Sequence, residues 1–213
     1  MKIRVLLADD HAVVRDGLKA LLQHTAGITV VGEAANGREA VDRAAQLKPD
    51  VVVMDLTMPG LNGIEAARQV RERCPATQVV MLSMHSDSEH VYRAFEAGAA
   101  SFVLKESAGE EVAAAVRAVH AGQRYLSRAI TAIEPGIRSR AARTSPLERL
   151  SAREREVLQL VVEGRSSAEI AATLHLSPKT VETYRVRLMA KLGVRDVPGL
   201  VRFAIEHGLT PPG

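Results

Sequence analysis

Five side chains in the first half of the sequence have the chemical types that phosphoryl transfer needs. The adjacent carboxylates Asp9 and Asp10 follow one short apolar run, and Asp55 follows another. Ser83 and Lys105 end two further apolar runs. A carboxylate can attack phosphorus as a nucleophile, and hydroxyl and ammonium groups neutralise phosphoryl oxygens. The set therefore predicts chemistry on a phosphoryl group, provided that the fold brings the five side chains together.

The segments that must position these side chains alternate between strands and helices. Short apolar runs rich in β-branched residues predict buried strands at Ile3–Ala8, Ile28–Gly32, Val51–Met54, Gln78–Leu82 and Ala100–Leu104. Amphipathic stretches predict helices at about 12–24, 37–47, 62–73, 87–97 and 108–121. Such alternation requires right-handed crossovers between parallel strands, with helices on both faces of the sheet. We predict an α/β doubly wound (βα)5 domain over residues 1–122.

A doubly wound sheet binds ligands beyond the carboxyl ends of its strands, where the strand order reverses. In the order 2-1-3-4-5 the first and third strands are neighbours, so Asp9, Asp10 and Asp55 converge. Like charges at that distance repel unless a cation lies between them, and oxygen donors suit Mg²⁺. A single Asp at a strand end is more often a turn or cap residue, so the prediction depends on the whole set. Asp55 is then the nucleophile that forms an acyl phosphate.

The end of the chain, 148–213, has only helical patterns. Ser151–Glu154 and Ser166–Glu169 match the capping box, and Ser177-Pro178 places an N-cap before a proline at the first helical position. Ser107–Glu110 matches the same box ahead of the fifth helix of the first domain. Four short helices fit, and two of them, Ser166–Leu174 and Pro178–Leu192, have helix-turn-helix proportions. Their shared core is expected at Ile170, Leu174, Leu176, Val181 and Leu188.

Charge separates the two parts of the chain. Residues 1–122 hold 13 Lys and Arg against 16 Asp and Glu, whereas residues 123–213 hold 15 against 9. The second helix of the pair carries the polar residues Lys179, Thr180, Glu182, Thr183, Arg185, Arg187 and Lys191. This basic surface predicts binding of duplex DNA in the major groove, because the scarce aromatic residues disfavour single strands. A small amphipathic bundle with a solvated charged face is the alternative.

The first 122 residues resemble the receiver domain of response regulators. The resemblance is carried by Asp9-Asp10, by Asp55-Leu-Thr-Met-Pro59 with Gly63, by Ser83, and by Phe102-Val-Leu-Lys105. It implies a flavodoxin-like fold in which Asp55 accepts a phosphoryl group from a phosphohistidine of a sensor histidine kinase. One departure is Glu106, because many receivers carry proline directly after the lysine.

The resemblance also implies a role for each remaining residue of the set. Asp10, Asp55 and the carbonyl of Thr57 would hold Mg²⁺ with help from Asp9. Ser83 and Phe102 would be the coupled switch residues that rearrange on phosphorylation, and Lys105 would form an ion pair with the phosphoryl group.

The C-terminal part resembles the LuxR-type effector module, and the whole chain resembles NarL/FixJ-type regulators. The motifs are Leu150–Leu158, Glu169-Ile-Ala171, Ser177–Tyr184 and Lys191-Leu-Gly-Val194. The family places Glu182 and Thr183 at base edges and makes Lys179, Arg185, Arg187 and Lys191 phosphate contacts. Relatives often carry Lys where this chain has Glu182, which either selects a base by accepting from cytosine or points away. A last helix, Val197–His207, packs in the core and by resemblance pairs with a second copy, giving a homodimer when active.

Two rival functions stay open. An aspartate-nucleophile phosphatase would usually place a second carboxylate two residues beyond the nucleophile, but that residue is Thr57. A regulator that works without phosphorylation is disfavoured by the intact acidic residues.

The remaining expectations concern organisation and location. Residues 123–147 are interpreted as a linker with a short helix within Gln123–Ile133, because Pro, Gly and Arg follow without an apolar period. The single Cys74, the lack of a leader pattern and the lack of a long apolar run predict a cytoplasmic protein with no membrane partner.

Overall fold

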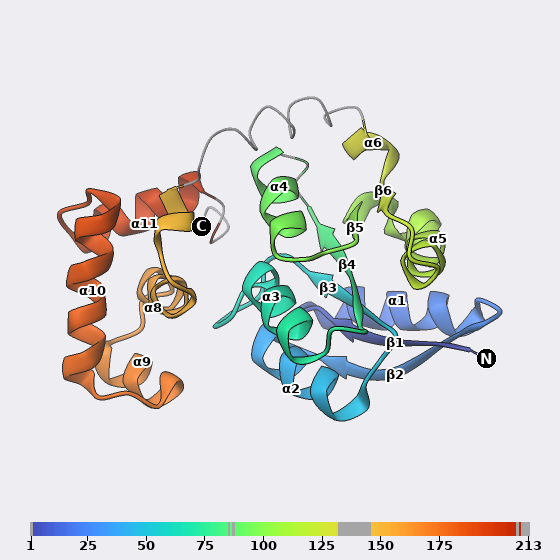
Figure 1. The fold of residues 1–213 in the computed structure, drawn as a ribbon, viewed down its shortest axis with the longest axis horizontal. Helices are drawn as coiled ribbons and strands as arrows, with labels where there is room; N and C mark the ends of the chain where they lie inside the picture. Colours follow the sequence, from blue (N-terminus) through green and yellow to red (C-terminus); the bar gives the residue numbers. More distant parts are fainter. Residues whose placement is uncertain (1, 85, 87, 132–145, 208, 210–213) are drawn as a thin grey trace. The chain divides into compact units, whose positions relative to one another are not determined.

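The computed structural model describes residues 2–84, 86, 88–131, 146–207 and 209 (Figure 1). The chain divides into two compact units, Met1–Ala142 and Arg143–Gly213. Most of the predicted linker, residues 132–145, lies outside the described residues.

The N-terminal unit is built on a parallel sheet with the order β2-β1-β3-β4-β5-β6. Its strands are β1 (Ile3–Ala8), β2 (Ile28–Ala34), β3 (Val51–Asp55), β4 (Gln78–Ser83), β5 (Ser101–Leu104) and β6 (Tyr125–Leu126). Strands β3, β4 and β5 are buried at every position, apart from Gln78 at the start of β4. Continuous apolar runs of this kind form strands covered on both faces. The predicted order of the first five strands is confirmed.

Helices cover both faces of this sheet (Figure 1). α2 (Gly37–Leu47), α3 (Gly63–Arg73) and α4 (Ser88–Glu96) pack on one face, and α1 (Ala12–His24) and α5 (Ala108–His120) pack on the other. Alternate residues of each strand supply the two cores: Leu6 and Val52 face the first group of helices, and Val5 and Val51 face the second. This is the doubly wound arrangement that the alternating pattern predicts.

The sheet has one strand more than the sequence analysis predicts. β6 pairs with β5 through Tyr125 and Leu126, and the short helix α6 (Arg128–Thr131) follows it. A two-residue strand leaves no detectable alternation, so only the pairing partner on β5 defines it. α6 lies within the range where a short helix was predicted.

One predicted cap is wrong. Ser107 precedes α5, but no capping bond from its side chain is present. Lys105–Ser107 form the 3-10 turn η1, which leads directly into α5, so Ser107 has φ −102° and ψ 1° instead of the extended backbone of a capping residue. Its hydroxyl donates to the carbonyl of Leu104 at 3.2 Å.

The C-terminal unit contains four α-helices among the residues described there: α8 (Ala152–Val162), α9 (Ser167–Leu174), α10 (Pro178–Leu192) and α11 (Val197–Glu206), preceded by the 3-10 turn η2 (Pro146–Arg149). Both predicted capping boxes are present at Ser151 and Ser166. Ser177 caps α10, whose first residue is a proline. The predicted helix boundaries follow from these local signals.

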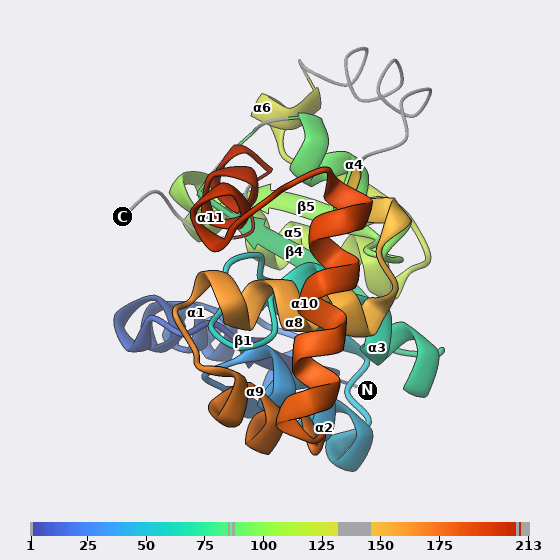
Figure 2. The same cartoon turned by 90° about the vertical axis from the view of Figure 1, so that its left-hand side faces the viewer.

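The C-terminal core joins all four helices. Ile170, Leu174, Val181 and Leu188 are buried as predicted, whereas Leu176 is only partly buried. Figure 2 shows α8 crossing behind α10, with α9 at the N-terminal end of α10. From α11, Leu200 and Ala204 enter the same core. None of the helices among the described residues combines the length and the apolar character that crossing a bilayer requires.

Candidate functional site

The carboxyl ends of β1, β3, β4 and β5 bring the predicted acidic residues and the lysine together. Lys105 Nζ lies 2.8 Å from Asp9 Oδ2 and 3.0 Å from Asp55 Oδ2. All three side chains are nearly inaccessible to solvent, at 8%, 2% and 4% exposure for Lys105, Asp9 and Asp55. The ammonium group therefore bridges two buried carboxylates, which are side by side because β1 and β3 are neighbours.

Burial and charge shift the protonation of both partners. Burial raises the pKa of Asp55 to about 6; the charge of Lys105 opposes this shift, and the charge of Asp9 adds to it. Burial lowers the pKa of Lys105, but the nearby Asp55 and Asp9 outweigh it and hold the pKa above its usual value. Lys105 thus stays charged at neutral pH. Its charge only partly offsets the free-energy cost of burying the ionised Asp55 carboxylate.

A group of side chains around this pair can hold a divalent cation. Ligand atoms of Asp9, Asp10, His11 and Asp55 all lie within 4.8 Å of one another; we call this group the acidic cluster. Asp10 and His11 are exposed, and His11 Nδ1 lies 2.8 Å from Asp10 Oδ1. The carboxylate oxygens are the donors that a small, hard dication prefers. His11 is not among the residues that the sequence analysis selects, and its position directly after the acidic pair was the available signal.

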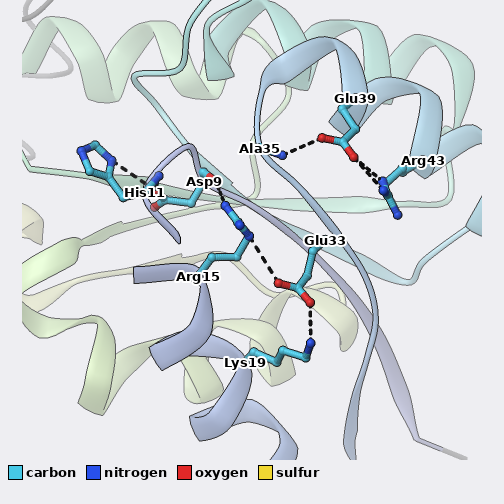
Figure 3. A network of polar contacts seen from close by, with 8 residues as sticks. All are labelled: Asp9, His11, Arg15, Lys19, Glu33, Ala35, Glu39 and Arg43. Carbon is cyan, nitrogen blue, oxygen red and sulfur yellow. Dashed lines mark hydrogen bonds and ion pairs between the residues drawn. The ribbon is translucent and has the colours of Figure 1, made fainter. Parts of the chain in front are cut away.

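A chain of polar contacts holds the backbone at Asp9 (Figure 3). Arg15 of α1 donates from Nη1 to the Asp9 carbonyl at 2.7 Å, and Arg15 Nε donates to Glu33 at 3.3 Å. Lys19 donates to the same Glu33 carboxylate at 2.5 Å. The Asp9 side chain also accepts from the backbone N–H of His11 at 2.8 Å. These contacts from α1 and β2 fix the position of Asp9, and none was anticipated from the sequence.

The loop after β3 closes tightly against Asp55. The Gly63 N–H donates to the Leu56 carbonyl at 2.8 Å. A Cβ atom at Gly63 would lie 2.0 Å from the Asp55 carbonyl oxygen, far inside contact distance, so only glycine fits. The start of α3 is thereby packed directly on the backbone that carries the Asp55 side chain.

The two predicted switch residues lie on the neighbouring strands. Ser83 is buried at the end of β4, opposite Leu104 of β5. Phe102 is fully buried within β5, in the core beneath α2, α3 and α4. Thr57 is partly exposed in the loop after β3, and the role of its carbonyl stays a prediction.

The second candidate site is the exposed surface of α10. Lys179, Thr180, Thr183 and Arg187 line an open hollow of about 320 Å³ together with Ser177 and Tyr184. Cationic and hydroxyl groups are the donors that contact DNA phosphates, and a helix fits the major groove. Four residues of the predicted DNA-binding set therefore share one surface, and Tyr184 is a hollow-lining residue that the sequence analysis did not select.

Three other residues of the predicted set have partners within the C-terminal unit. Lys191 Nζ lies 2.7 Å from Glu154 Oε2, at the start of α8. Burial raises the pKa of Glu154, but hydrogen bonds from Lys191 and Ser151 outweigh it and lower the pKa overall. Glu182 accepts from the Ser167 hydroxyl and lies 3.3 Å from Arg185 Nη1. These contacts connect α10 to α8 and α9.

Two family models match the chain. The model described as "Response regulator receiver domain" matches residues 5–117, and the model described as "Bacterial regulatory proteins, luxR family" matches residues 148–204. The first match contains the acidic cluster and Lys105, and the second contains α8 to α10 with most of α11.

Curated relatives align over nearly the full chain. Response regulator UvrY of Escherichia coli strain K12 is 38% identical over 97% of this chain and 95% of its own length. Response regulator protein VraR of Staphylococcus aureus is 38% identical over 98% of this chain and 99% of its own length. Transcriptional regulatory protein MctR of Rhizobium johnstonii is 40% identical over 98% and 95%.

Solved structures give the same result. A LuxR-family two-component response regulator from Aurantimonas sp. SI85-9A1 is 39% identical with a TM-score of 0.61, covering 67% of this chain and 99% of that chain. The two-component response regulator RcsB in its complex with DNA is 26% identical with a TM-score of 0.61, covering 95% and 98% of the two chains.

Proposed function

The chain belongs to the NarL/FixJ-type two-component response regulators and is a transcriptional regulator, and from this premise we propose that Asp55 is its phosphoryl acceptor. The proposed receiver is 1–122, the linker 123–147 and the DNA-binding domain 148–213. A sensor histidine kinase supplies the phosphoryl group, and the action takes place in the cytoplasm, where Cys74 stays a free thiol.

One observation carries the proposal: the Lys105 ammonium lies within 3.0 Å of both Asp9 and Asp55 inside the acidic cluster. A carboxylate oxygen of Asp55 attacks phosphorus, the P–N bond of the phosphohistidine breaks, and the imidazole leaves. Lys105 then neutralises a phosphoryl oxygen, as it neutralises the two carboxylates before transfer.

Mg²⁺ is the cofactor that fits this donor set. Asp9, Asp10, Asp55 and the carbonyl of Thr57 would hold it, and it would supply positive charge between the carboxylates and the phosphoryl oxygens. Ser83 and Phe102 are proposed as the switch residues. Both are buried: Ser83 ends β4, the strand that pairs with β3, and Phe102 lies on β5, which pairs with β4. A change at the end of β3 can therefore reach Phe102 by way of β4.

Duplex DNA is the proposed target of α10. Lys179, Thr180, Thr183 and Arg187 gather around one exposed hollow, which supports contacts to phosphates and base edges. Arg185, Lys191 and Glu182 complete the proposed set. The active form is proposed to be a homodimer, which is supported by the two RcsB dimers bound to DNA in one related structure.

The test is labelling of the full chain with acetyl phosphate and Mg²⁺. We expect an acid-stable, hydroxylamine-sensitive adduct on the wild-type protein and none on Asp55→Asn. The matched control is Asp50→Asn, which changes an aspartate before β3 and should leave labelling intact. Labelling that survives Asp55→Asn would refute the assignment of the acceptor.

The same preparation tests whether the chain turns over small molecules. We propose that it does not, because Thr57 stands where a phosphatase of this type needs a second carboxylate. Incubation with small phosphate esters should release phosphate at the rate of buffer alone. Multiple turnovers that depend on Asp55 would support the enzyme alternative.

A further inference from the structure

Glu182 lies on the DNA-binding helix with a negative charge, which phosphates repel. Its carboxylate oxygen Oε1 accepts from the hydroxyl of Ser167, the first residue of α9. Arg185 Nη1 donates to Ser167 Oγ at 2.9 Å and lies 3.3 Å from the same Glu182 oxygen. The three side chains thus form a closed ring of contacts between α9 and α10, which we call the Ser167 clamp.

The clamp occupies one end of the Arg185 guanidinium. A guanidinium carries five N–H donors in a planar fork. Among the described residues, both contacts of Arg185 use Nη1, so the edge formed by Nε and Nη2 keeps its donors. That edge matches the two oxygens of a phosphate in a bidentate pair.

The clamp also restricts the side chain. The exposed fraction of the Arg185 side chain is 23%, against 57% for Glu182. A free arginine loses rotamer entropy when it binds, and a side chain that is already held in one position loses less. Contacts on both sides of Nη1 therefore prepare Arg185 for binding before DNA arrives.

We propose that Glu182 and Ser167 are positioning residues that present the Nε/Nη2 edge of Arg185 to a phosphate of duplex DNA. Glu182 then selects no base, because its carboxylate is turned toward Ser167 and Arg185. This inference rests on the proposed DNA-binding function. It gives a role to Glu182, the one residue of α10 whose charge opposes that function.

The test uses the full-length chain and two probes: duplexes selected by the wild-type protein from a random-sequence pool, and duplexes of mixed sequence. Ser167→Ala removes the clamp hydroxyl without changing charge. We expect it to weaken binding to both probes by the same factor, about fivefold, which corresponds to about 1 kcal/mol. Ser167→Thr keeps the hydroxyl and should restore binding.

A double-mutant cycle separates positioning from structure. In an Arg185→Ala background, Ser167→Ala should cause no further loss, because the group that it positions is gone. Selection repeated with Glu182→Ala should return the same preferred bases as the wild type. Thermal unfolding of every variant, followed by circular dichroism, verifies that the helices persist.

Three results would overturn the clamp: an unchanged affinity for Ser167→Ala, an equal loss in the Arg185→Ala background, or a relaxed base preference in Glu182→Ala. Each of these leaves wild-type DNA binding intact, so the proposed function stands. A wild-type chain that binds neither probe would overturn the function and the clamp together.

Discussion

The acidic cluster and the exposed surface of α10 both consist largely of charged side chains, but those charges are mostly buried in the first region and mostly exposed in the second. In the N-terminal unit one buried ammonium lies between two buried carboxylates, and Asp10 and His11 lie close to them. On α10 the charged groups are spread along one helix, and several are exposed to solvent. Burial strengthens electrostatic interactions and solvent screens them, so one substitution should have a large effect in the first region and a small one in the second.

The largest effect is expected at Lys105. Lys105→Met leaves two buried carboxylates without their cation, and the free energy of unfolding at pH 7 should fall by about 3 kcal/mol. Added Mg²⁺ should restore part of this loss by replacing the missing charge. Urea unfolding with and without Mg²⁺ measures both effects.

Lys2→Met is the control for Lys105→Met, since Lys2 is exposed on the same unit and should change stability little. Equal stability of the two variants would remove the basis of the comparison between buried and exposed charge.

The next effect concerns pH. The pKa of Asp55 is raised to about 6, so the folded chain binds more protons than the unfolded chain between the ordinary Asp value and pH 6. Stability from this group is therefore present at low pH and is lost as the pH rises through about 6. In metal-free buffer, Asp55→Asn should raise the free energy of unfolding at pH 7 by on the order of 2 kcal/mol.

Denaturant titrations over a range of pH check this sign. The gain from Asp55→Asn should shrink as the pH falls below 6 and disappear once Asp55 is protonated in both folded and unfolded states. A gain that is independent of pH would show that Asp55 ionisation is not its cause.

A smaller effect is expected at Lys191, the cation of α10 that pairs with a buried carboxylate. Lys191→Ala breaks the contact with Glu154, whose side chain is 5% exposed, and should cost about 1 kcal/mol. The hydrogen bonds that lower the pKa of Glu154 stabilise the ionised form, so their contribution is present at neutral pH and lost on acidification. A variant difference that persists unchanged in acid would contradict this ion pair.

The smallest effect should come from a single exposed cation. Lys179→Ala should change the free energy of unfolding very little, but it should reduce the slope of log affinity against log salt by about 0.9, the value for one phosphate contact. Fluorescence anisotropy with duplex DNA at several salt concentrations measures the slope. Arg187→Ala should behave alike, and an unchanged slope for both would exclude the hollow as a phosphate site.

The sequence predicts most of the fold where the signal is local. Runs such as Ile3–Ala8 and the helix 12–24 have the same bounds in the structure, because apolar period and flanking polar residues define them. β6 escapes prediction because two residues carry no period, and Ser107 was misjudged because the turn η1 precedes α5. Local motifs fail where tertiary structure selects the backbone.

The candidate sites follow the same rule. The meeting of Asp9, Asp55 and Lys105 could be predicted, because parallel strands end at one edge of the sheet. The contacts of Arg15 with Asp9 and of Lys191 with Glu154 join residues on different elements, and their partners depend on how α1, α8 and α10 pack. No residue spacing in the sequence predicts contacts of this kind between separate elements.

The close packing of Gly63 on the Asp55 carbonyl has a consequence for how variants of this protein should be interpreted. Adding one methyl group there alters no charge, yet the strand end that bears Asp55 must move to make room. A survey of variants confined to polar positions would miss this glycine, although its replacement by alanine should abolish phosphorylation of the acceptor that we propose.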